Sequence, residues 1–209
     1  VANLVAELGD PLKSPAETGI GIKIISREAT RRIVRRAIQF AVETGRKTVT
    51  VVHKGNIQKF TEGAFKLWAF ELAAEEFGDL VINEDDLWAN HDGKLPEGKI
   101  LLNSKIADAI FYEVLLNPEQ FSVLVMPNLN GDFLSDACAA QIGGLGMAGG
   151  INSGDSAAIF EALHGTAESI ADKNAANPTS LILAGIMMLE YLGWHEARTQ
   201  SEKPLARTA

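Results

Sequence analysis

The 209-residue sequence predicts an α/β fold with a mixed sheet flanked by helices. Residues 48–53 form a β-branched run without polar alternation, which is typical of a strand covered on both faces. A helical pattern follows this run, and a second short strand is predicted at 80–82. Strand, helix and strand in succession are the building unit of α/β proteins.

Local signals define the elements of the first half of the chain. Alternating isoleucines predict a strand within 11–25. Ser26 is expected to cap a helix over 27–44 with a solvated arginine face, and Thr61 to cap a helix that runs through Phe77. A glycine follows each helix and is expected to end it.

The second half alternates helices, strands and irregular segments. Residues 84–99 have no clear period and are expected to form a surface loop or hairpin. Ser104 is expected to cap a helix over 105–116, and residues 196–209 lose all apolar periodicity. The other expected elements are strands at 121–126 and 157–162, a helix that carries Asp132 and Asp136, a glycine-rich break at 143–150, a loop at 164–177 and a helix at 179–192.

The composition argues against several classes of function. Nineteen basic and 27 acidic residues give a formal net charge of −8, so no broad basic face is expected for nucleic acid or anionic lipid. The longest apolar stretch, 181–189, is too short to span a bilayer, and no charged-then-apolar leader opens the chain. The single cysteine, Cys138, cannot form an intrachain disulfide and is expected to be buried. We therefore expect a cytoplasmic protein.

Three aspartates are candidates for a metal site. Asp132 and Asp136 stand four residues apart at the start of a helix, so both carboxylates project from one face, where oxygen ligands suit a hard divalent cation. A solvated acidic face that stabilises the helix N-terminus is the alternative. Asp108 interrupts an apolar helix face, where an acid needs a partner.

Lys54 and His164 are the other candidates for chemistry. Lys54 ends a buried strand just before a turn, and a lysine in such a place can transfer protons when its pKa is lowered. The alternative is a strand-end lysine that reaches into solvent. His164 follows a predicted strand, and a lone histidine there is more often a hydrogen-bonded structural residue. The glycine run at 143–150 matches neither a dinucleotide-binding fingerprint nor a P-loop.

Four motifs occur in a fixed order, and they are His53–Gly63, Ile106–Ala109, Asn128–Asp136 and His164–Ala167. In this order they closely resemble the isocitrate/isopropylmalate dehydrogenase family, and within it isocitrate dehydrogenase of the bacterial dimeric type. The resemblance extends from about Thr18 to Trp194. Lys59–Gly63 resembles the isocitrate branch more than the isopropylmalate, homoisocitrate or tartrate dehydrogenases.

The resemblance implies roles for the metal and substrate residues. Asp132 and Asp136 would bind Mg²⁺ or Mn²⁺, together with Asp108 from the other subunit of a homodimer. Lys54, also reaching across the dimer interface, would be the catalytic residue that handles the 2-hydroxyl proton of isocitrate. Asn56 would lie beside the substrate.

The resemblance also implies a dinucleotide site outside the Rossmann class. Ser169 and Ile170 occupy positions where NADP-using members have a lysine and a tyrosine, and Glu168 would repel a 2′-phosphate. We therefore expect NAD rather than NADP, unless the loop is shifted, because Asp172–Asn174 also differs. The residues expected to surround the coenzyme are Glu161, His164, Gly165, Thr166, Ala167, Ile170 and Asn177.

The implied activity is the metal-dependent oxidative decarboxylation of isocitrate to 2-oxoglutarate with reduction of NAD(P), in the tricarboxylic acid cycle. Residues 1–25 are expected to belong to a clasp region, 26–145 to a small α/β domain with dimer-interface helices, and 146–209 to part of a large domain with the coenzyme loop. The family's substrate-gripping serine and arginines have no counterpart here, so the chain is expected to be a central fragment. The alternatives are a truncated noncatalytic chain and an oxidative decarboxylase of a related 2-hydroxy acid.

Overall fold

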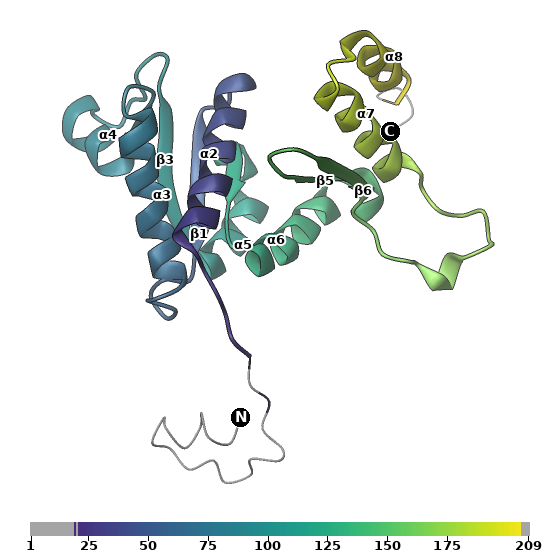
Figure 1. Cartoon of the computed structure of the whole chain (residues 1–209), viewed down its shortest axis with the longest axis horizontal. Helices are drawn as coiled ribbons and strands as arrows, with labels where there is room; N and C mark the ends of the chain where they lie inside the picture. The colour runs from purple at the N-terminus through teal and green to yellow at the C-terminus, as the bar shows by residue number, and fades with distance from the viewer. Residues whose placement is uncertain (1–18, 20, 206–209) are drawn as a thin grey trace. The chain divides into compact units, whose positions relative to one another are not determined.

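The computed structural model describes residue 19 and residues 21–205, which fold into two compact units (Figure 1). The first unit comprises the described residues up to Ile106 together with 122–125, and the second comprises the others. The predicted α/β class is confirmed. This division cuts the chain differently from the clasp, small-domain and large-domain segments that the resemblance implies, and those segments stay a prediction.

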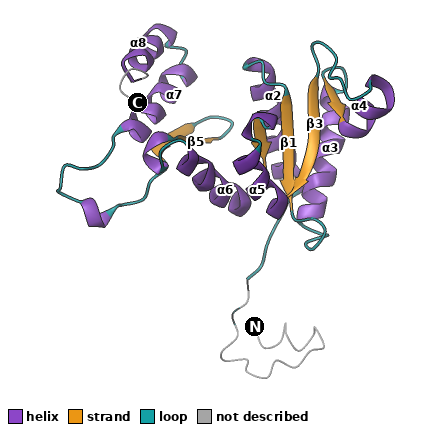
Figure 2. Cartoon of the chain, turned by 180° about the vertical axis from the view of Figure 1, so that it is seen from behind, coloured by secondary structure: helices purple, strands orange, loops and turns teal. Residues whose placement is uncertain are grey.

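A four-stranded parallel sheet forms the centre of the first unit (Figure 2). The strand order is β2-β3-β1-β4. The strands are β1 (Thr48–His53), β2 (Val81–Asn83), β3 (Ile100–Ile106) and β4 (Val123–Val125). β1 pairs with neighbours on both sides, and residues 49–53 are all buried, as its unbroken β-branched pattern predicts.

Helices α2 (Arg27–Glu43) and α3 (Glu62–Phe77) pack against this sheet. Ser26 caps α2 as predicted, because its hydroxyl accepts a hydrogen bond from the Ala29 N–H at 3.1 Å. Thr61 precedes α3 but its side chain makes no capping hydrogen bond. The buried core includes Val34, Ile38, Val49, Val51, Phe65, Leu72 and Leu102.

The arginines of α2 do not form the purely solvated face that their spacing predicts. Three of them pair with glutamates of α3, in the pairs Arg27–Glu71, Arg31–Glu75 and Arg35–Glu76, at 2.7, 2.7 and 2.6 Å. The hydrogen bonds from Arg35 and Arg31 hold the pKa of Glu76 below its usual value. Each such surface pair stabilises the fold little, but the row of pairs aligns the two helices.

The strand expected within 11–25 is absent from the described part of that segment. Several of its residues lie outside the described ones, and residues 21–26 have no regular secondary structure. Ile22 and Ile24 are 78% and 81% exposed. The prediction is wrong there, because alternating isoleucines form a strand only where a neighbouring strand can pair with them.

Helix α4 (Glu84–His91) replaces the first part of the surface loop expected at 84–99. Asn83 caps it by accepting a hydrogen bond from the Asp86 N–H at 2.8 Å, and three acids occupy its first turn. Leu87 is its only buried residue, so the helix lacks the apolar stripe on which a periodicity analysis depends.

β3 occupies a segment for which no strand was predicted, and Ser104 lies within it instead of capping a helix. Helix α5 (Ala107–Leu116) follows immediately, two residues later than expected. The segment has a polar centre, Asn103–Lys105, that hides its strand character. Its position between β2 and β1 makes it a central strand.

The second unit contains a helix pair and a helix-covered hairpin. α5 packs against α6 (Asn128–Gln141), the predicted helix that carries Asp132 and Asp136. β5 (Gly149–Ser153) and β6 (Ala158–Ala162) form an antiparallel sheet that packs against α7 (Thr179–Tyr191). The antiparallel pairing expected of a mixed sheet thus lies in a sheet of its own.

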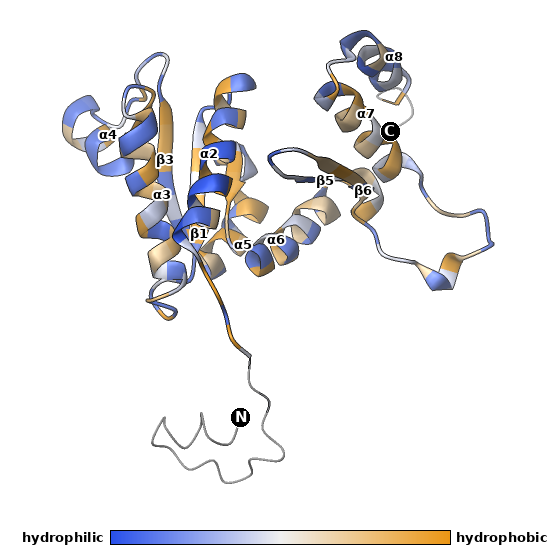
Figure 3. Cartoon of the chain, viewed as in Figure 1, coloured by the Kyte–Doolittle hydropathy of each residue, from blue (hydrophilic) through white to orange (hydrophobic). Residues whose placement is uncertain are grey.

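Two further elements correct the expectations for this unit. β5 was not predicted, because the glycine run hides its strand character. α8 (His195–Leu205) occupies most of the tail that was expected to lack a pattern. It has no buried residue, and hydrophilic colour dominates it in Figure 3. No helix among the described residues combines the length and the apolar character needed to cross a bilayer.

Packing and turn geometry explain the glycine-rich run. Gly143 and Gly144 have φ of +117° and +101°, in the turn that leaves α6. Gly149 lies directly against α7, because a Cβ built on it would be 2.9 Å from the backbone nitrogen of Ala184. The run therefore serves helix packing here, and a nucleotide fingerprint is not needed to explain it.

Gly149→Ala is expected to lower the free energy of unfolding by about 1–3 kcal/mol, the usual effect of overpacking. The added methyl group meets α7 backbone, which cannot move as a flexible side chain can. Gly185→Ala on α7 is the matched control, because its Cβ has no atom within 4 Å and alanine favours the helix. Urea unfolding of both variants measures the difference, and equal stabilities would contradict this packing.

Candidate active site

Lys54 follows the carboxyl end of β1 in a tight turn. Its carbonyl oxygen accepts hydrogen bonds from the N–H groups of Ile57 and Gln58, at 3.1 and 2.9 Å. Lys54 is half-buried and Asn56 is exposed. The turn therefore presents both predicted residues beyond the sheet edge where α/β folds place functional side chains.

Two side chains that were not predicted as site residues hold this turn. Glu62 is 1% exposed, and its carboxylate accepts a hydrogen bond from the backbone N–H of Lys54 and pairs with Lys23. Nδ1 of His53 accepts a hydrogen bond from the Gly55 N–H at 3.0 Å. An acid in the first turn of a helix is an ordinary surface signal, so the burial of Glu62 could be found only from the structure.

The surroundings of His53 favour the neutral form of its imidazole. It is buried, and desolvation lowers the pKa of its imidazole below the ordinary 6.5. The Lys66 ammonium lowers the pKa further, while the Glu62 carboxylate opposes both effects. Because Nδ1 accepts the hydrogen bond from Gly55, the neutral ring carries its proton on Nε2.

We expect the free energy of unfolding to decrease as the pH falls below 6.5, because the unfolded chain then binds a proton that folded His53, with its lowered pKa, does not. His53→Asn keeps an acceptor for the Gly55 N–H and cannot titrate in this range. Urea unfolding at about pH 7.5 and about pH 5.5 should therefore show a smaller loss of stability for the variant. Equal losses in both proteins would contradict the burial of an uncharged His53.

The three predicted metal residues lie in the second unit. Asp132 and Asp136 are one turn apart on α6, and both are exposed. Asp108 is exposed in the first turn of α5. Among the described residues, no three His, Cys, Asp or Glu side chains gather closely enough to hold a metal ion.

The chemistry of the α6 pair fits a hard divalent cation. Two carboxylates one helical turn apart offer oxygen ligands of the kind that Mg²⁺ and Mn²⁺ accept. Among the described residues of one chain, no third acidic side chain lies close enough to join this pair at a metal ion. Asp132 and Asp136 could thus form one side of a metal site whose other ligands come from outside these residues.

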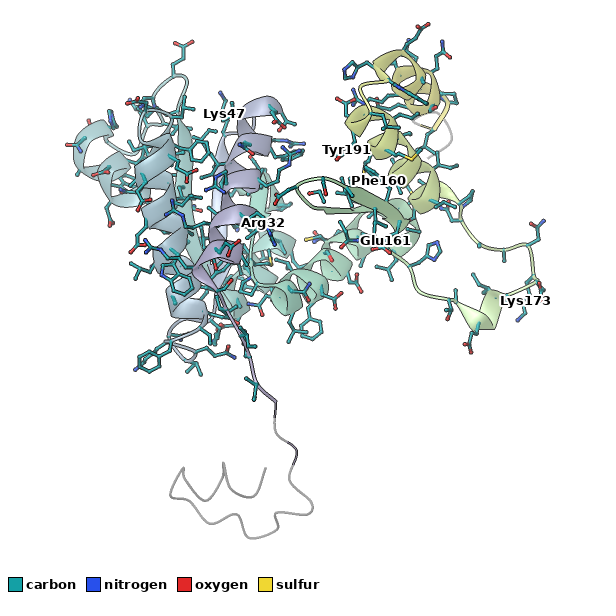
Figure 4. All side chains as sticks on the ribbon, in the orientation of Figure 1. Arg32, Lys47, Phe160, Glu161, Lys173 and Tyr191 are labelled. Atoms are coloured by element: carbon teal, nitrogen blue, oxygen red, sulfur yellow. The ribbon has the colours of Figure 1, made fainter. Side chains whose placement is uncertain are left out.

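A long loop between β6 and α7 carries most of the predicted coenzyme residues. Residues 164–170 are all exposed. Ala167 has a left-handed backbone, with φ of +48°, and directly precedes the short 3₁₀ helix Glu168–Ile170. Glu161 precedes the loop on β6, where its carboxylate accepts a hydrogen bond from the Asn152 side-chain amide at 2.6 Å (Figure 4).

Both ends of this loop are anchored at the start of α7. The buried Ser180 hydroxyl accepts a hydrogen bond from the Leu163 N–H at 3.0 Å and donates one to the Ala148 carbonyl oxygen. Oδ1 of Asn177 accepts a hydrogen bond from the Thr179 N–H at 3.0 Å. These bonds hold the first and last predicted coenzyme residues of the loop near one helix end.

Lys173 brings a positive charge back to the centre of the loop. Its Nζ donates a hydrogen bond to the Ser169 carbonyl oxygen at 2.8 Å (Figure 4). The ammonium group therefore lies beside Ser169, the position at which the resemblance implies a lysine in NADP-using members. The charge in this part of the loop therefore depends on Lys173 as well as on the side chains of Ser169 and Ile170.

Two other features do not involve the predicted site residues. Cys138 is half-buried on α6, and burial raises the pKa of its thiol, which disfavours a reactive thiolate. A hollow at the junction of α7 and α8 is lined by six residues: Gly193, Trp194, His195, Glu196, Ala197 and Gln200.

The comparisons with known proteins agree on one family. The sequence matches the isocitrate/isopropylmalate dehydrogenase model over residues 7–208. It is 52% identical over 192 residues to the isocitrate dehydrogenase (NADP) of Archaeoglobus fulgidus, covering 92% of this chain and 47% of that protein. The isocitrate dehydrogenase (NADP) of Staphylococcus aureus is 48% identical over 200 residues, covering 89% and 47%.

The structure is similar to the crystal structure of isocitrate dehydrogenase from Methylococcus capsulatus. The TM-score is 0.78 at 39% sequence identity, and the match covers 93% of this chain and 51% of that one. The chain spans about half the length of the curated relatives it matches.

These relatives contradict one prediction. Their names specify NADP, so the preference for NAD that we inferred from Ser169 and Ile170 is wrong. That inference weighed Ser169, Ile170 and Glu168. It assigned no charge to Lys173, whose ammonium group the folded loop brings to Ser169. The predicted family is confirmed over nearly the whole sequence. The chain belongs to the isocitrate/isopropylmalate dehydrogenase family.

Proposed function

We propose that this protein is an NADP-dependent isocitrate dehydrogenase, which converts isocitrate to 2-oxoglutarate by oxidative decarboxylation. The observation that carries the proposal is the Lys54–Asn56 turn, held at the end of a central parallel strand in a chain 52% identical to a protein of that name. A cytoplasmic location and a place in the tricarboxylic acid cycle are parts of the same proposal.

Lys54 and Asn56 would act on the substrate. Lys54 would take the proton of the substrate 2-hydroxyl from its half-buried position at the end of β1. Asn56 would contact the substrate from the same turn. A divalent cation at Asp132 and Asp136, with the partner's Asp108, would stabilise negative charge that develops on the substrate oxygens.

A homodimer would complete this site, with Lys54 and Asp108 acting across the interface. Its support is a set of large apolar side chains that stay exposed on α5 and α6. They are Tyr112, Leu115, Leu116, Leu129 and Phe133, which are between 55% and 70% exposed. Exposed apolar surface of this kind marks an interaction site, so these helices are the proposed interface.

NADP would bind along the loop between β6 and α7. The proposed contacts are Glu161, His164, Gly165, Thr166, Ala167, Ile170 and Asn177. Lys173 supports a 2′-phosphate in this place, because an ammonium group neutralises a phosphate and donates hydrogen bonds to it.

The test is the appearance of reduced nicotinamide, measured by absorbance, with protein expressed from its complete reading frame. Isocitrate, Mg²⁺ and either NADP or NAD are supplied, and isopropylmalate and homoisocitrate serve as alternative substrates. We expect turnover with isocitrate and NADP. Faster turnover with another 2-hydroxy acid would replace the substrate assignment, and no turnover from the folded protein would contradict the proposed activity.

A further inference from the structure

Glu62 is the one acidic residue buried among the residues that the structure describes. It opens α3 and is 1% exposed. A buried carboxylate destabilises a fold unless hydrogen-bond donors replace its water. Here the donors include the backbone N–H of Lys54 and the ammonium group of Lys23. The buried charge is therefore bound to the residue that we propose as catalytic.

The two ends of the segment 54–63 lie in contact with each other, and Glu62 is near its C-terminal end. The Gly63 N–H donates a hydrogen bond to the Gln58 carbonyl oxygen at 3.0 Å. A Cβ built on Gly55 would lie 2.8 Å from Cα of Gly63, so only glycine allows this approach. The close contact brings the first turn of α3 against the turn that follows β1, and the Glu62 carboxylate thereby reaches the Lys54 amide.

We propose that Glu62 is a positioning residue, which fixes the backbone of Lys54 and so sets the direction in which the lysine side chain leaves the sheet. This role rests on the proposed function of Lys54. A hydrogen bond to a charged acceptor is about twice as strong as one between neutral groups. Displacement of a reacting group by about 1 Å can lower a rate roughly 100-fold. Glu62 acts through Lys54 and is not assigned a contact with the substrate.

Lys23 takes part in the same arrangement. It lies in the irregular segment just before α2, and its ammonium group pairs with the Glu62 carboxylate. The Lys23 side chain is about one-third exposed, at 34%, whereas that of Glu62 is only 2% exposed. Removal of this cation leaves the buried carboxylate with one donor fewer, so the carboxylate is held less firmly against the Lys54 amide.

A purely structural role would have different consequences. If Glu62 only stabilised the start of α3, its loss would lower the free energy of unfolding and leave kcat of the folded enzyme unchanged. A positioning role instead lowers kcat with little change in the KM for isocitrate, because the substrate is still bound. It also exposes the Lys54 amide to solvent exchange, which can be followed without any turnover.

The experiment compares Glu62→Gln and Lys23→Met with wild type, in protein expressed from its complete reading frame. Glu71→Gln is the matched control, because this glutamate lies on the same helix and pairs with Arg27 at the surface. The measurements are kcat, the KM for isocitrate, and hydrogen exchange of the Lys54 amide at one pH. We expect Glu62→Gln to lower kcat about 10- to 100-fold, with KM within about twofold.

The Lys54 amide is expected to exchange at least about tenfold faster in Glu62→Gln than in wild type or Glu71→Gln. If Glu62→Gln fails to fold, Lys23→Met, which keeps the carboxylate, is expected to show the same two changes in smaller degree. Unchanged kcat and unchanged exchange in the folded variants would overturn the proposal. If wild type itself shows no turnover, the proposed activity fails, and faster exchange in Glu62→Gln alone would still show that Glu62 holds the turn.

Discussion

Lys54→Met is expected to lower kcat with isocitrate and NADP by about 100- to 10,000-fold, the range that loss of a general acid–base group produces. Methionine keeps the length and the apolar stem of lysine but has no group that can take the 2-hydroxyl proton. The turn itself is expected to survive, because Glu62 and His53 bind backbone N–H groups within it. The free energy of unfolding should therefore change little.

Steady-state kinetics of protein from the complete reading frame measure this effect. Lys59→Met is the matched control, because Lys59 is an exposed lysine of the same segment with no proposed role in catalysis. Its kcat should stay within about twofold of wild type. A similar loss in both variants would assign the effect to the charge of the segment and remove Lys54 from the mechanism.

Loss of a residue that only supports a metal ligand weakens metal binding roughly 10- to 100-fold. Asp132→Asn removes a proposed ligand itself, so it is expected to weaken Mn²⁺ binding by more than this. Asparagine has nearly the shape of aspartate but lacks the negative charge on which a hard cation depends. Because Asp132 is exposed on α6, the substitution should leave the fold intact. Isothermal titration calorimetry with Mn²⁺ measures this binding without any turnover.

Asp155→Asn is the control for this titration, because Asp155 is an exposed aspartate in the turn of the β5–β6 hairpin. Its loss removes the same charge from the second unit at a position without a proposed metal. Equal weakening of Mn²⁺ binding in the two variants would show that the binding depends only on the net charge of the protein. No weakening in Asp132→Asn would place the metal elsewhere.

Continuous sequence patterns were the most reliable guides to the fold. β1 was predicted residue for residue, because a strand with neighbours on both sides buries every side chain, and its β-branched run shows this directly. The start of α2 was predicted from Ser26, whose capping bond is local. Lys54 attracted attention because it follows such a strand. In each case the residues that decide the structure are neighbours in the chain.

Segments whose burial depends on distant partners were missed. The polar centre of β3 hides a strand that is central only because β2 and β1 flank it. The row of ion pairs between α2 and α3 depends on a crossing that no local pattern predicts. β5 was hidden by glycines, whose close approach to α7 is visible only in the folded unit.

The α/β class, the family and the segments in which the candidate site residues stand can therefore be predicted from the amino-acid sequence alone. Which side chains support these residues depends on the folded chain. The fold buries Glu62 against the Lys54 amide and brings Lys173 back to Ser169. The position of Lys173 accords with the NADP-named relatives, where Ser169, Ile170 and Glu168 had indicated NAD. Burial and charge neutralisation depend on contacts between residues far apart in the chain, or on loop geometry, and residue type alone records neither.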